Sequence, residues 1–415
     1  MTDSAVLPAT IQSRCCIVGG GPAGMMLGLL LARAGVSVTL LEKHADFFRD
    51  FRGDTIHPST LELMYELGFL DEFLKLPHQA LNKIDACINE TITPIADLTA
   101  LPTQCKFIAF MPQWDFLNLI AEQAKKYPSF QLYMATEATG LVEANGVITG
   151  VTAKTATADI TVLADLVIAA DGRFSTVRDL AGMQVIDKGV PIDVLWLRLS
   201  KQATDVSATL GRIRGNRMMI MIDRGQYWQC GVIIAKNGLN ELKQQGLAAF
   251  REYLVKLTPF LVDRVDEITD WEQIKLLTVQ INHLKQWHRP GLLCIGDAAH
   301  AMSPAGGVGV NLAIQDAVAT ANLLAEKLRT DATINESDLH RVQQRREWPM
   351  RVIQTLQAFI HKRVGLGPLE TAQTSLPMPV KLLRHWPLLQ RLPARIIGIG
   401  LRPEHIQTKD AWHKP

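Results

Sequence analysis

The amino-acid sequence predicts an α/β fold, in which a domain with a parallel sheet is joined to a second domain with an antiparallel sheet. Two short apolar runs, 15–18 and 36–41, flank a stretch whose apolar residues recur at helical spacing. A glycine-rich turn precedes this helix, and Gly35 ends it. From about 185 to 279, strand-like runs alternate with turns that contain glycine. The 415 residues suffice for two packed domains.

The first turn has the pattern Gly19-x-Gly21-x-x-Gly24, which is typical of dinucleotide-binding folds. The first glycine permits a tight turn, the second lets a pyrophosphate approach the backbone, and the third lets helix and strand pack closely. Glu42 ends the second strand, 23 positions after Gly19, where a carboxylate accepts hydrogen bonds from a ribose hydroxyl. A carboxylate there disfavours a 2′-phosphate, so the pocket is not expected to take NADP.

Composition excludes several classes of protein. The 43 basic and 41 acidic residues nearly balance, which gives no reason to expect nucleic acid as a partner. Six cysteines in so long a chain do not make a disulfide framework, and their spacing suggests no metal site. The first residues have no apolar core of signal-peptide length, and no uncharged apolar run is long enough to span a bilayer. We therefore expect a cytoplasmic protein.

The chain after the second strand continues the alternation of helices and strands. A helix is expected over 59–67, with Ser59 as its N-cap. Alternating apolar residues over 84–88 and an apolar run over 107–111 predict strands. Residues 114–126 have the pattern of an amphipathic helix.

The middle of the chain is predicted to be rich in strands. Residues 132–151 resemble a β-meander that turns at Asn145-Gly146, a type I′ pair. The apolar strand 163–170 follows. Further elements are expected as strands over 194–199, 218–222, 228–234 and 292–295, a helix over 241–257, and a long helix after 310.

Three motifs stand in a fixed order: the glycine turn, Asp171-Gly172 within AADGRFSTVR, and Gly296-Asp297 within CIGDAAHAMSPAGGVGVNLAIQDA. Together they resemble the fingerprints of the class A, single-component FAD-dependent aromatic monooxygenases, typified by para-hydroxybenzoate hydroxylase and the ubiquinone-biosynthesis hydroxylases. The resemblance implies a Rossmann-like FAD-binding domain of the GR2 type, an antiparallel substrate domain and a C-terminal helical segment. The implied bounds are 12–78, 107–184 and 284–345 for the first, 79–106 and 185–283 for the second, and 346–415 for the third.

The resemblance also implies roles for individual residues. Asp297 accepts hydrogen bonds from the ribityl hydroxyls, while Asp171 and Gly172 serve both FAD and the nicotinamide nucleotide. Arg52 is placed on the pyrophosphate and Gln113 on the ribityl chain. Local roles stay open beside these, as a solvated arginine for Arg52 and as helix caps for Gln113 and Asp171. The other positions assigned to FAD are Ala23, Lys43, Gly296, Pro304, Gly306, Gly307, Gly309, Val310 and Asn311.

The implied reaction uses NADPH or NADH to reduce non-covalently held FAD, and then O₂ as a flavin C4a-hydroperoxide to hydroxylate an aromatic, quinone-like or polycyclic small molecule. No catalytic side chain is assigned, and His57 and His300 are expected to be structural. Three alternatives stay open: a halogenase, an isoprenoid reductase, and a non-catalytic protein that binds flavin or an intermediate. The tryptophans do not form the Trp-x-Trp-x-Ile-Pro segment of halogenases.

Two apolar features have more than one interpretation. Met218, Met219, Met221 and the Tyr227-Trp228 pair lie on expected strands, where they could wall a substrate or form ordinary core. The segment 380–403 mixes leucine, isoleucine and tryptophan with basic residues. It could pack over the FAD domain, form a homodimer contact in a protein otherwise monomeric, or lie on anionic lipid. Intramolecular packing is favoured, because three prolines break any long helix.

Overall fold

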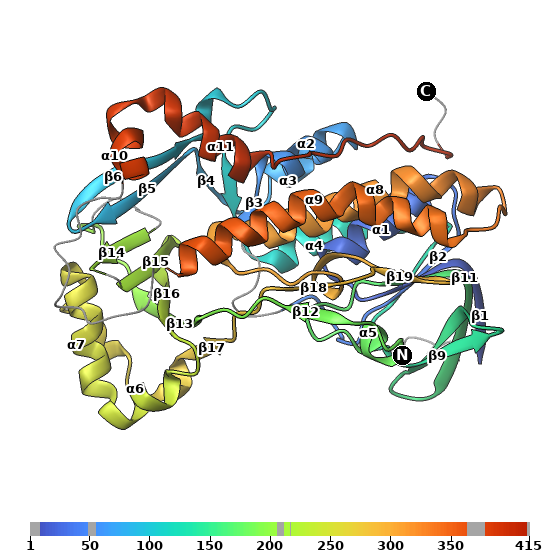
Figure 1. The fold of residues 1–415 in the computed structure, drawn as a ribbon, viewed down its shortest axis with the longest axis horizontal. Coiled ribbons are helices and arrows are strands. Elements are labelled where there is room, and N and C mark those ends of the chain that lie inside the picture. Colours follow the sequence, from blue (N-terminus) through green and yellow to red (C-terminus); the bar gives the residue numbers. More distant parts are fainter. Residues whose placement is uncertain (1–8, 49–54, 206–210, 216, 363–377, 413–415) are drawn as a thin grey trace.

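The computed structural model describes residues 9–48, 55–205, 211–215, 217–362 and 378–412. Two large sheets lie at opposite ends of the molecule, and the long helices α8 (Val308–Arg329) and α9 (Glu336–His361) run beside each other between them (Figure 1). The mixed α/β architecture that the sequence predicts is therefore confirmed.

The first sheet is the nucleotide-binding sheet, with the strand order β19-β20-β11-β1-β2-β8. From β1 the chain adds β2 and β8 on one side, and it later adds β11 and β20 on the other. Because the order reverses between β1 and β11, a crevice opens there at the carboxyl ends of the strands. The strands are β1 (Thr10–Val18), β2 (Val38–Leu41), β8 (Phe130–Tyr133), β11 (Asp159–Ala169), β19 (His288–Arg289) and β20 (Leu292–Cys294).

Helices and a hairpin complete this domain. The helix α1 (Pro22–Arg33) packs against α8 and α4 (Gln113–Lys125), and ten of its residues are buried. The strands β9 (Glu137–Ala144) and β10 (Val147–Lys154) extend the sheet from β11. Asn145 and Gly146 join them with φ of 50° and 77°, which confirms the expected turn.

The second sheet has seven strands in the order β17-β13-β16-β15-β14-β5-β6. Its neighbours are antiparallel as expected, except that β5 and β14 pair in parallel. One face packs on α7 (Leu247–Leu257), and the other packs on residues that include Ile108, Phe110 and Ala394. The strands are β5 (Lys83–Ile88), β6 (Thr91–Asp97), β13 (Ile192–Ser200), β14 (Gly211–Arg214), β15 (Arg217–Asp223), β16 (Tyr227–Ala235) and β17 (Lys275–Leu277).

Two helix predictions need correction. The single helix expected over 241–257 is two helices, α6 (Leu239–Gln245) and α7 (Leu247–Leu257), because Gly246 between them has φ of 91°. The helix α2 (Pro58–Glu66) begins one residue earlier than expected, so Ser59 lies inside it and is not its cap. Smaller elements are α3 (Leu70–Leu74), α5 (Thr176–Leu180), β12 (Val185–Asp187), β18 (Asn282–Leu284), and the sheet of β3 (Thr55–Ile56), β7 (Ile108–Phe110) and β4 (Gln79–Leu81).

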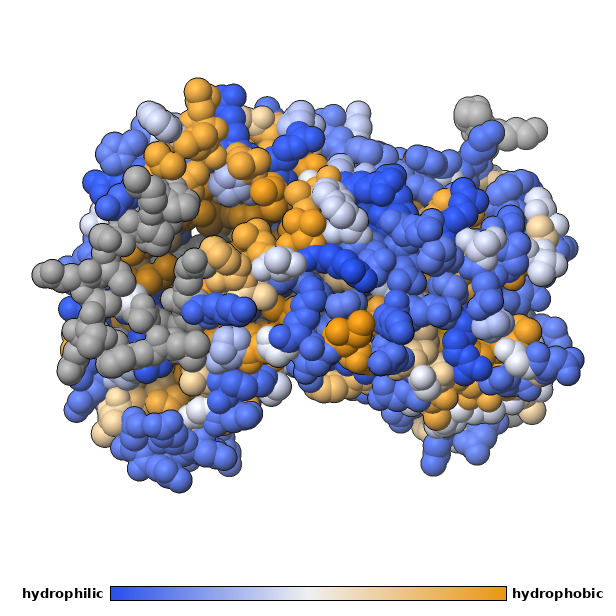
Figure 2. Space-filling model, viewed as in Figure 1, coloured by the Kyte–Doolittle hydropathy of each residue, from blue (hydrophilic) through white to orange (hydrophobic). Residues whose placement is uncertain are grey.

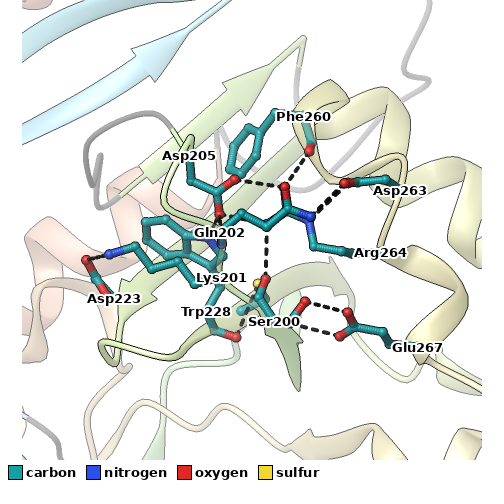
Figure 3. Close-up of polar contacts among 11 residues, drawn as sticks. Ser200, Lys201, Gln202, Asp205, Asp223, Trp228, Phe260, Asp263, Arg264 and Glu267 are labelled. Carbon is teal, nitrogen blue, oxygen red and sulfur yellow. Dashed lines mark hydrogen bonds and ion pairs between the residues drawn. The ribbon is translucent and has the colours of Figure 1, made fainter.

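A buried ion pair holds the outer end of the second sheet (Figure 3). The guanidinium of Arg264 donates to both carboxylate oxygens of Asp205, over 2.7 and 2.8 Å, and Trp228 Nε1 donates to the same carboxylate over 2.7 Å. The hydrogen bonds from Arg264 hold the pKa of Asp205 well below its usual range. Nearby, Lys201 Nζ lies 2.6 Å from Asp223 Oδ2, which joins the end of β13 to the end of β15.

The C-terminal segment is helical only in part. It contains the part of α9 from 346 onward, α10 (Met378–His385), the 3₁₀ turn η8 (Pro387–Gln390) and α11 (Arg391–Gly398). The described residues after Gly398 hold no helix and run in extended form across the FAD-binding elements (Figure 1). Arg33 donates to the Thr408 carbonyl over 2.7 Å, and Trp412 Nε1 donates to the Ala32 carbonyl over 2.9 Å.

A second buried charge network joins α8, α9 and this extended tail. Asp316 on α8 accepts from Arg346 Nε on α9 over 3.1 Å and from His300 Nε2 over 2.6 Å. Arg346 also donates to Glu404 on the tail over 3.1 Å, and Glu404 pairs with Arg345 over 2.7 Å. Burial alone would raise the pKa of Asp316, but His300 and Arg346 lower it below its usual value.

Among the described residues, the stretch Ala305–Arg329 has the length and apolar composition of a membrane span. The stretch is not a continuous uncharged run, because Asp316 interrupts it. Within its most apolar window, 72% is buried inside the protein. This is the burial of a core helix.

The Asp316 network makes a prediction about stability. Asp316→Asn removes the charge that pairs with Arg346 inside the protein, so we expect the free energy of unfolding to fall by about 3 kcal/mol. Because folding lowers the pKa of this carboxyl, its contribution is present above about pH 4 and is lost as the pH falls through the folded pKa. Urea unfolding at several pH values measures both effects, and the difference between variant and parent should shrink in acid.

Glu326→Gln is the matched control, because Glu326 lies on the same helix in an exposed pair with Arg329. No measurable change is expected for it. Equal urea midpoints for Asp316→Asn and the parent near neutral pH would contradict the role given to the network.

Candidate functional site

The three motifs and Glu42 meet at one edge of the nucleotide-binding sheet. In the parallel register Val18 at the end of β1 stands beside Leu41 of β2 and Ala169 of β11, and Ala169 stands beside Cys294 of β20. Each of these four strands therefore ends at the same level, and the motif that follows it enters the same crevice. The topology brings together residues that are up to 278 positions apart, from Gly19 to Asp297.

The three glycines of the first motif have different steric surroundings. A Cβ atom added at Gly19, whose φ is 108°, would lie 2.4 Å from the Ala170 carbonyl oxygen. A Cβ atom at Gly24 would lie 2.0 Å from the Gly19 carbonyl oxygen, so α1 needs glycine there to pack on β1. At Gly21 no described heavy atom lies within 4 Å of that position. The space over Gly21 fits the approach of a pyrophosphate.

The N-terminus of α1 is suited to an anion. Gly21 is its N-cap, Pro22 is its first residue, and none of the described side chains caps it. Ala23 lies in this first turn, which has no acidic residue. The N–H groups of a first helical turn have no partner inside the helix and carry the positive end of its dipole. They are the donors that phosphate groups use in dinucleotide folds.

Glu42 is held in place at the end of β2. The side chain is buried, with Oε2 accepting from the Gly20 N–H over 2.8 Å and Oε1 accepting from the His44 N–H over 3.0 Å. These two backbone donors fix the carboxylate at the level of the strand ends. Lys43 beside it is exposed.

The second motif makes its own small helix cap. Asp171 Oδ1 accepts from Ser175 Oγ over 2.5 Å, and Oδ2 accepts from the Val177 N–H over 3.1 Å. Ser175 is the N-cap of α5 and accepts from the Arg178 N–H over 3.0 Å. Burial raises the pKa of Asp171, and these hydrogen bonds partly oppose the rise. The capping alternative for Asp171 is thus present, and Gly172 follows it with φ of 88° and open space around it.

Two arginines connect the second motif to the third. Arg173 Nη2 lies 3.3 Å from Asp297 Oδ2, and Arg178 Nη1 donates to the Ala298 carbonyl over 3.4 Å. Arg173 Nη1 is buried and has no hydrogen-bond partner among the described residues. A buried donor of this kind fits a ligand rich in oxygen atoms. The sequence analysis did not single out Arg173, although it follows the Asp171-Gly172 pair directly.

The third motif depends on a close meeting of three elements at Gly296. Its φ is 58°, and an added Cβ atom would lie 3.1 Å from Cβ of both Ala23 and Ala313. The Gly296 N–H donates to Asp316 Oδ2 over 3.1 Å. Asp297, which follows, has a side chain that is 31% exposed and faces Arg173. This exposure leaves the carboxylate accessible to a ribityl chain.

The loop after the third motif is a glycine turn that opens α8. Gly306 and Gly307 both have positive φ, of 79° and 63°, and Gly307 is the N-cap of α8 without a described side-chain cap. Pro304, Gly309 and Val310 are partly exposed around it. The first turn of α8 therefore presents backbone N–H groups and the positive end of a 22-residue helix.

The side chain of Asn311 works within the protein. Its Oδ1 accepts from the His57 N–H over 3.0 Å and from Thr60 Oγ1 over 2.7 Å. Its Nδ2 donates to the carbonyls of Gly307 and Thr55, over 3.3 and 3.4 Å. Asn311 thus holds β3 and α2 against the glycine loop, and the backbone is the part left for a cofactor.

Both histidines that attract attention in the sequence make internal contacts. His57 Nδ1 lies 2.7 Å from the Ile397 carbonyl, which can only accept, so Nδ1 carries the proton. Burial lowers the pKa of His57 to about 4. His300 is bonded to Asp316, and its ring lies 4.8 Å from that of Trp287.

A cavity of about 330 Å³ lies between the second sheet and the FAD-binding elements. From the sheet come Arg198, Arg224, Tyr227 and Gln229, and Arg224 Nε donates to Gln229 Oε1 over 3.0 Å. The Arg198 guanidinium lies 5.2 Å from the centre of the Tyr227 ring. The opposite wall consists of Pro77, His78, Gln79, Phe110, Pro112 and Trp114. Gln113 is the first residue of α4, and in the sequence it stands between the wall residues Pro112 and Trp114.

The cavity separates the apolar residues that the sequence left open. Tyr227 lines it, whereas Met219, Met221 and Trp228 are buried in the core under α7. Met218 packs with the core on the other face of the sheet. Arg52 lies outside the described residues. Sequence reasoning missed Arg198 and Arg224, because neither stands in a motif.

The comparisons with known proteins agree with this geometry. A family model described as FAD binding domain matches residues 12–354. The curated relative 6-methylpretetramide 4-monooxygenase of Streptomyces rimosus is 34% identical over 330 residues, which cover 76% of this chain and 75% of the relative. Three further relatives are longer, and this chain spans 56 to 62% of their lengths.

Solved structures share the fold at low sequence identity. OxyS anhydrotetracycline hydroxylase from Streptomyces rimosus has a TM-score of 0.73 at 19% identity, covering 94% of this chain and 76% of that chain. The flavin-dependent brominase Bmp2 has a TM-score of 0.74 at 15% identity, covering 95% of this chain and 94% of that chain. The family match and the relative of Streptomyces rimosus go further than the fold: the chain belongs to the FAD binding domain family and is an FAD-dependent monooxygenase of the class A aromatic hydroxylases.

Proposed function

We propose that this protein hydroxylates a planar, polycyclic aromatic small molecule with acidic hydroxyl groups, using O₂ and NADPH or NADH. The observation that carries the proposal is the cavity beside the second sheet, which combines aromatic walls with the guanidinium groups of Arg198 and Arg224. Aromatic walls suit flat rings, and arginine suits phenolate or enolate oxygens. The relative that is 34% identical is named for 6-methylpretetramide, which supports a polycyclic substrate.

We propose that FAD lies in the crevice at the strand ends. When bound, FAD accepts a hydride from the nicotinamide nucleotide and supplies the oxygen chemistry. The first turn of α1 would bind the pyrophosphate together with Arg52, and Glu42 the adenosine ribose. Asp297 and Gln113 would bind the ribityl chain. The first turn of α8 would face the pyrimidine edge of the flavin and stabilise negative charge there.

The remaining expectations complete the proposal. The FAD-binding domain comprises 12–78, 107–184 and 284–345, the substrate domain 79–106 and 185–283, and the C-terminal segment 346–415. Asp171 and Gly172 would also meet the nicotinamide nucleotide. The protein would work in the cytoplasm, as a monomer or a homodimer.

Gly21→Ala tests the pyrophosphate position. Gly21 has φ of −76° and open space around it, so the added methyl group should cost only the difference between glycine and alanine at an N-cap, about 1 kcal/mol or less of the free energy of unfolding. The methyl group would occupy the approach of the pyrophosphate, and we expect FAD affinity to fall at least about ten-fold. Titration of deflavinated protein with FAD measures the affinity.

Gly24→Ala is the contrasting variant, because its Cβ atom would lie 2.0 Å from a backbone oxygen and should destabilise the fold itself. If Gly21→Ala binds FAD as tightly as the parent, the pyrophosphate does not lie over Gly21.

Asp297→Ala tests the ribityl position. The variant loses a hydrogen-bond acceptor and the partner of Arg173, so FAD binding should weaken by about 1.5–3 kcal/mol. Asp297→Asn keeps an acceptor and should lose less. Asp159→Ala, an exposed position at the start of β11, is the control and should bind FAD like the parent. Equal affinity for all four proteins would exclude this role.

The substrate class is tested with a panel of polycyclic phenols, scored for stimulated oxidation of NADPH and NADH and for products that gain one oxygen atom.

Arg224→Gln should raise KM for acidic substrates by about ten-fold, since a charge-assisted hydrogen bond is lost, with a smaller effect on neutral ones. Arg214→Gln, on the exposed end of β14, is the control.

A panel run with bromide present checks the halogenase alternative, and halogenated products in place of hydroxylated ones would overturn the proposal.

A further inference from the structure

An exposed apolar surface covers α10, η8 and α11. We call it the C-terminal apolar surface, and it consists of Leu382, Trp386, Leu388, Leu389 and Leu392. Trp386, Leu388 and Leu392 are 60, 70 and 64% exposed. Figure 2 shows apolar colouring gathered over this part of the molecule, at the upper left. Clusters of this kind on a protein surface mark contacts with a partner or a membrane.

The opposite face of the same segment packs inside the protein. Ala394 is fully buried, and an added Cβ atom at Gly398 would lie 2.7 Å from Leu101 Cδ1. The helices α10 and α11 both contact β6, and α11 also contacts the 3₁₀ turn Leu98–Ala100. Intramolecular packing therefore accounts for the inner face, and it leaves the outer leucines and the tryptophan unexplained.

The charged side chains of this segment have one sign. Residues 378–403 contain five lysine and arginine residues and no aspartate or glutamate. All five are exposed: Lys381, Arg384, Arg391, Arg395 and Arg402. The first acidic residue that follows, Glu404, is buried and pairs with Arg345 and Arg346. No carboxylate of this segment therefore neutralises the exposed basic groups.

We propose that the C-terminal apolar surface binds the headgroup region of an anionic phospholipid bilayer. Leucine side chains and a tryptophan on short helices are suited to the boundary between headgroups and acyl chains. Lysine and arginine around them are suited to the lipid phosphates. The contact is peripheral, because the segment is too short to span a membrane and its inner face is fixed to β6.

The charge also distinguishes this occupant from a second copy of the chain. A two-fold dimer would place the surface against itself, so that five basic side chains on one copy would face five on the other. Such a contact repels, whereas an anionic bilayer attracts every one of these side chains. The inference goes beyond hydroxylation, and its test does not depend on turnover.

The test uses the full-length protein loaded with FAD and co-sedimentation with two kinds of vesicle. One is pure phosphatidylcholine, and the other is an equal mixture of phosphatidylcholine and phosphatidylglycerol. At low salt we expect at least about ten-fold stronger binding to the mixed vesicles, and this preference should fall at high salt.

Two sets of variants separate the apolar and the charged contributions. Leu388→Ser with Leu392→Ser should lower binding to mixed vesicles about ten-fold or more, whereas Val262→Ser, 61% exposed elsewhere, should not. Arg384→Gln, Arg391→Gln and Arg395→Gln together should remove the preference for phosphatidylglycerol. The control replaces three exposed lysines outside the C-terminal apolar surface, as Lys75→Gln, Lys125→Gln and Lys154→Gln. The FAD content of every variant should match the parent.

Several results would overturn the proposal. The first is no binding to mixed vesicles at low salt, and the second is equal binding by the parent and the leucine variant. A dimer, detected by light scattering, that dissociates in the leucine variant would identify a second copy as the occupant. Retention on immobilised polyglutamate without vesicle binding would instead identify an acidic protein.

Discussion

The buried carboxylate of Asp316 is the constraint on which the rest of the site depends. A charge inside a protein is stable only when its partners are complete, and here they come from three directions. The Gly296 N–H comes from the third motif, His300 from the loop behind it, and Arg346 from α9. Arg346 in turn reaches Glu404 on the tail. The carboxylate of Asp316 therefore holds the turn at Gly296 against α8.

Much of the FAD crevice could be predicted from the sequence, because its signals are local. A strand, a glycine turn and a helix follow one another within 24 residues, and backbone sterics alone assign Gly19, Gly21 and Gly24 their different places. The strand order itself comes from the structure, and its reversal between β1 and β11 is the kind of position at which open α/β sheets bind ligands. The break at Gly246 was missed because apolar periodicity continues across it, and only its φ of 91° separates the two helices.

The polar networks and the cavity could not be predicted, because they join residues that are distant in the sequence. Asp316 and Glu404 are 88 positions apart, and Arg198 meets Trp114 only after two sheets have packed. The sheet that carries Arg198, Arg224 and Tyr227 is fixed from its far side by Arg264 and Asp205 and at its end by Lys201 and Asp223 (Figure 3). Both faces of this sheet carry buried core, so Arg198, Arg224 and Tyr227 line the cavity from a sheet that is fixed on both sides.

The helix α11 links the C-terminal apolar surface to the glycine turn that opens α8 through a short chain of hydrogen bonds. His57 Nδ1 donates to the Ile397 carbonyl of α11, and the His57 N–H donates to Asn311, which also contacts the Gly307 carbonyl. The inner face of α11 is therefore part of the support of the loop, while Leu392 on its outer face is 64% exposed. Because the two faces do different work, changes at Gly398 and changes at Leu392 should have separate effects, the first on FAD retention and the second on surface binding.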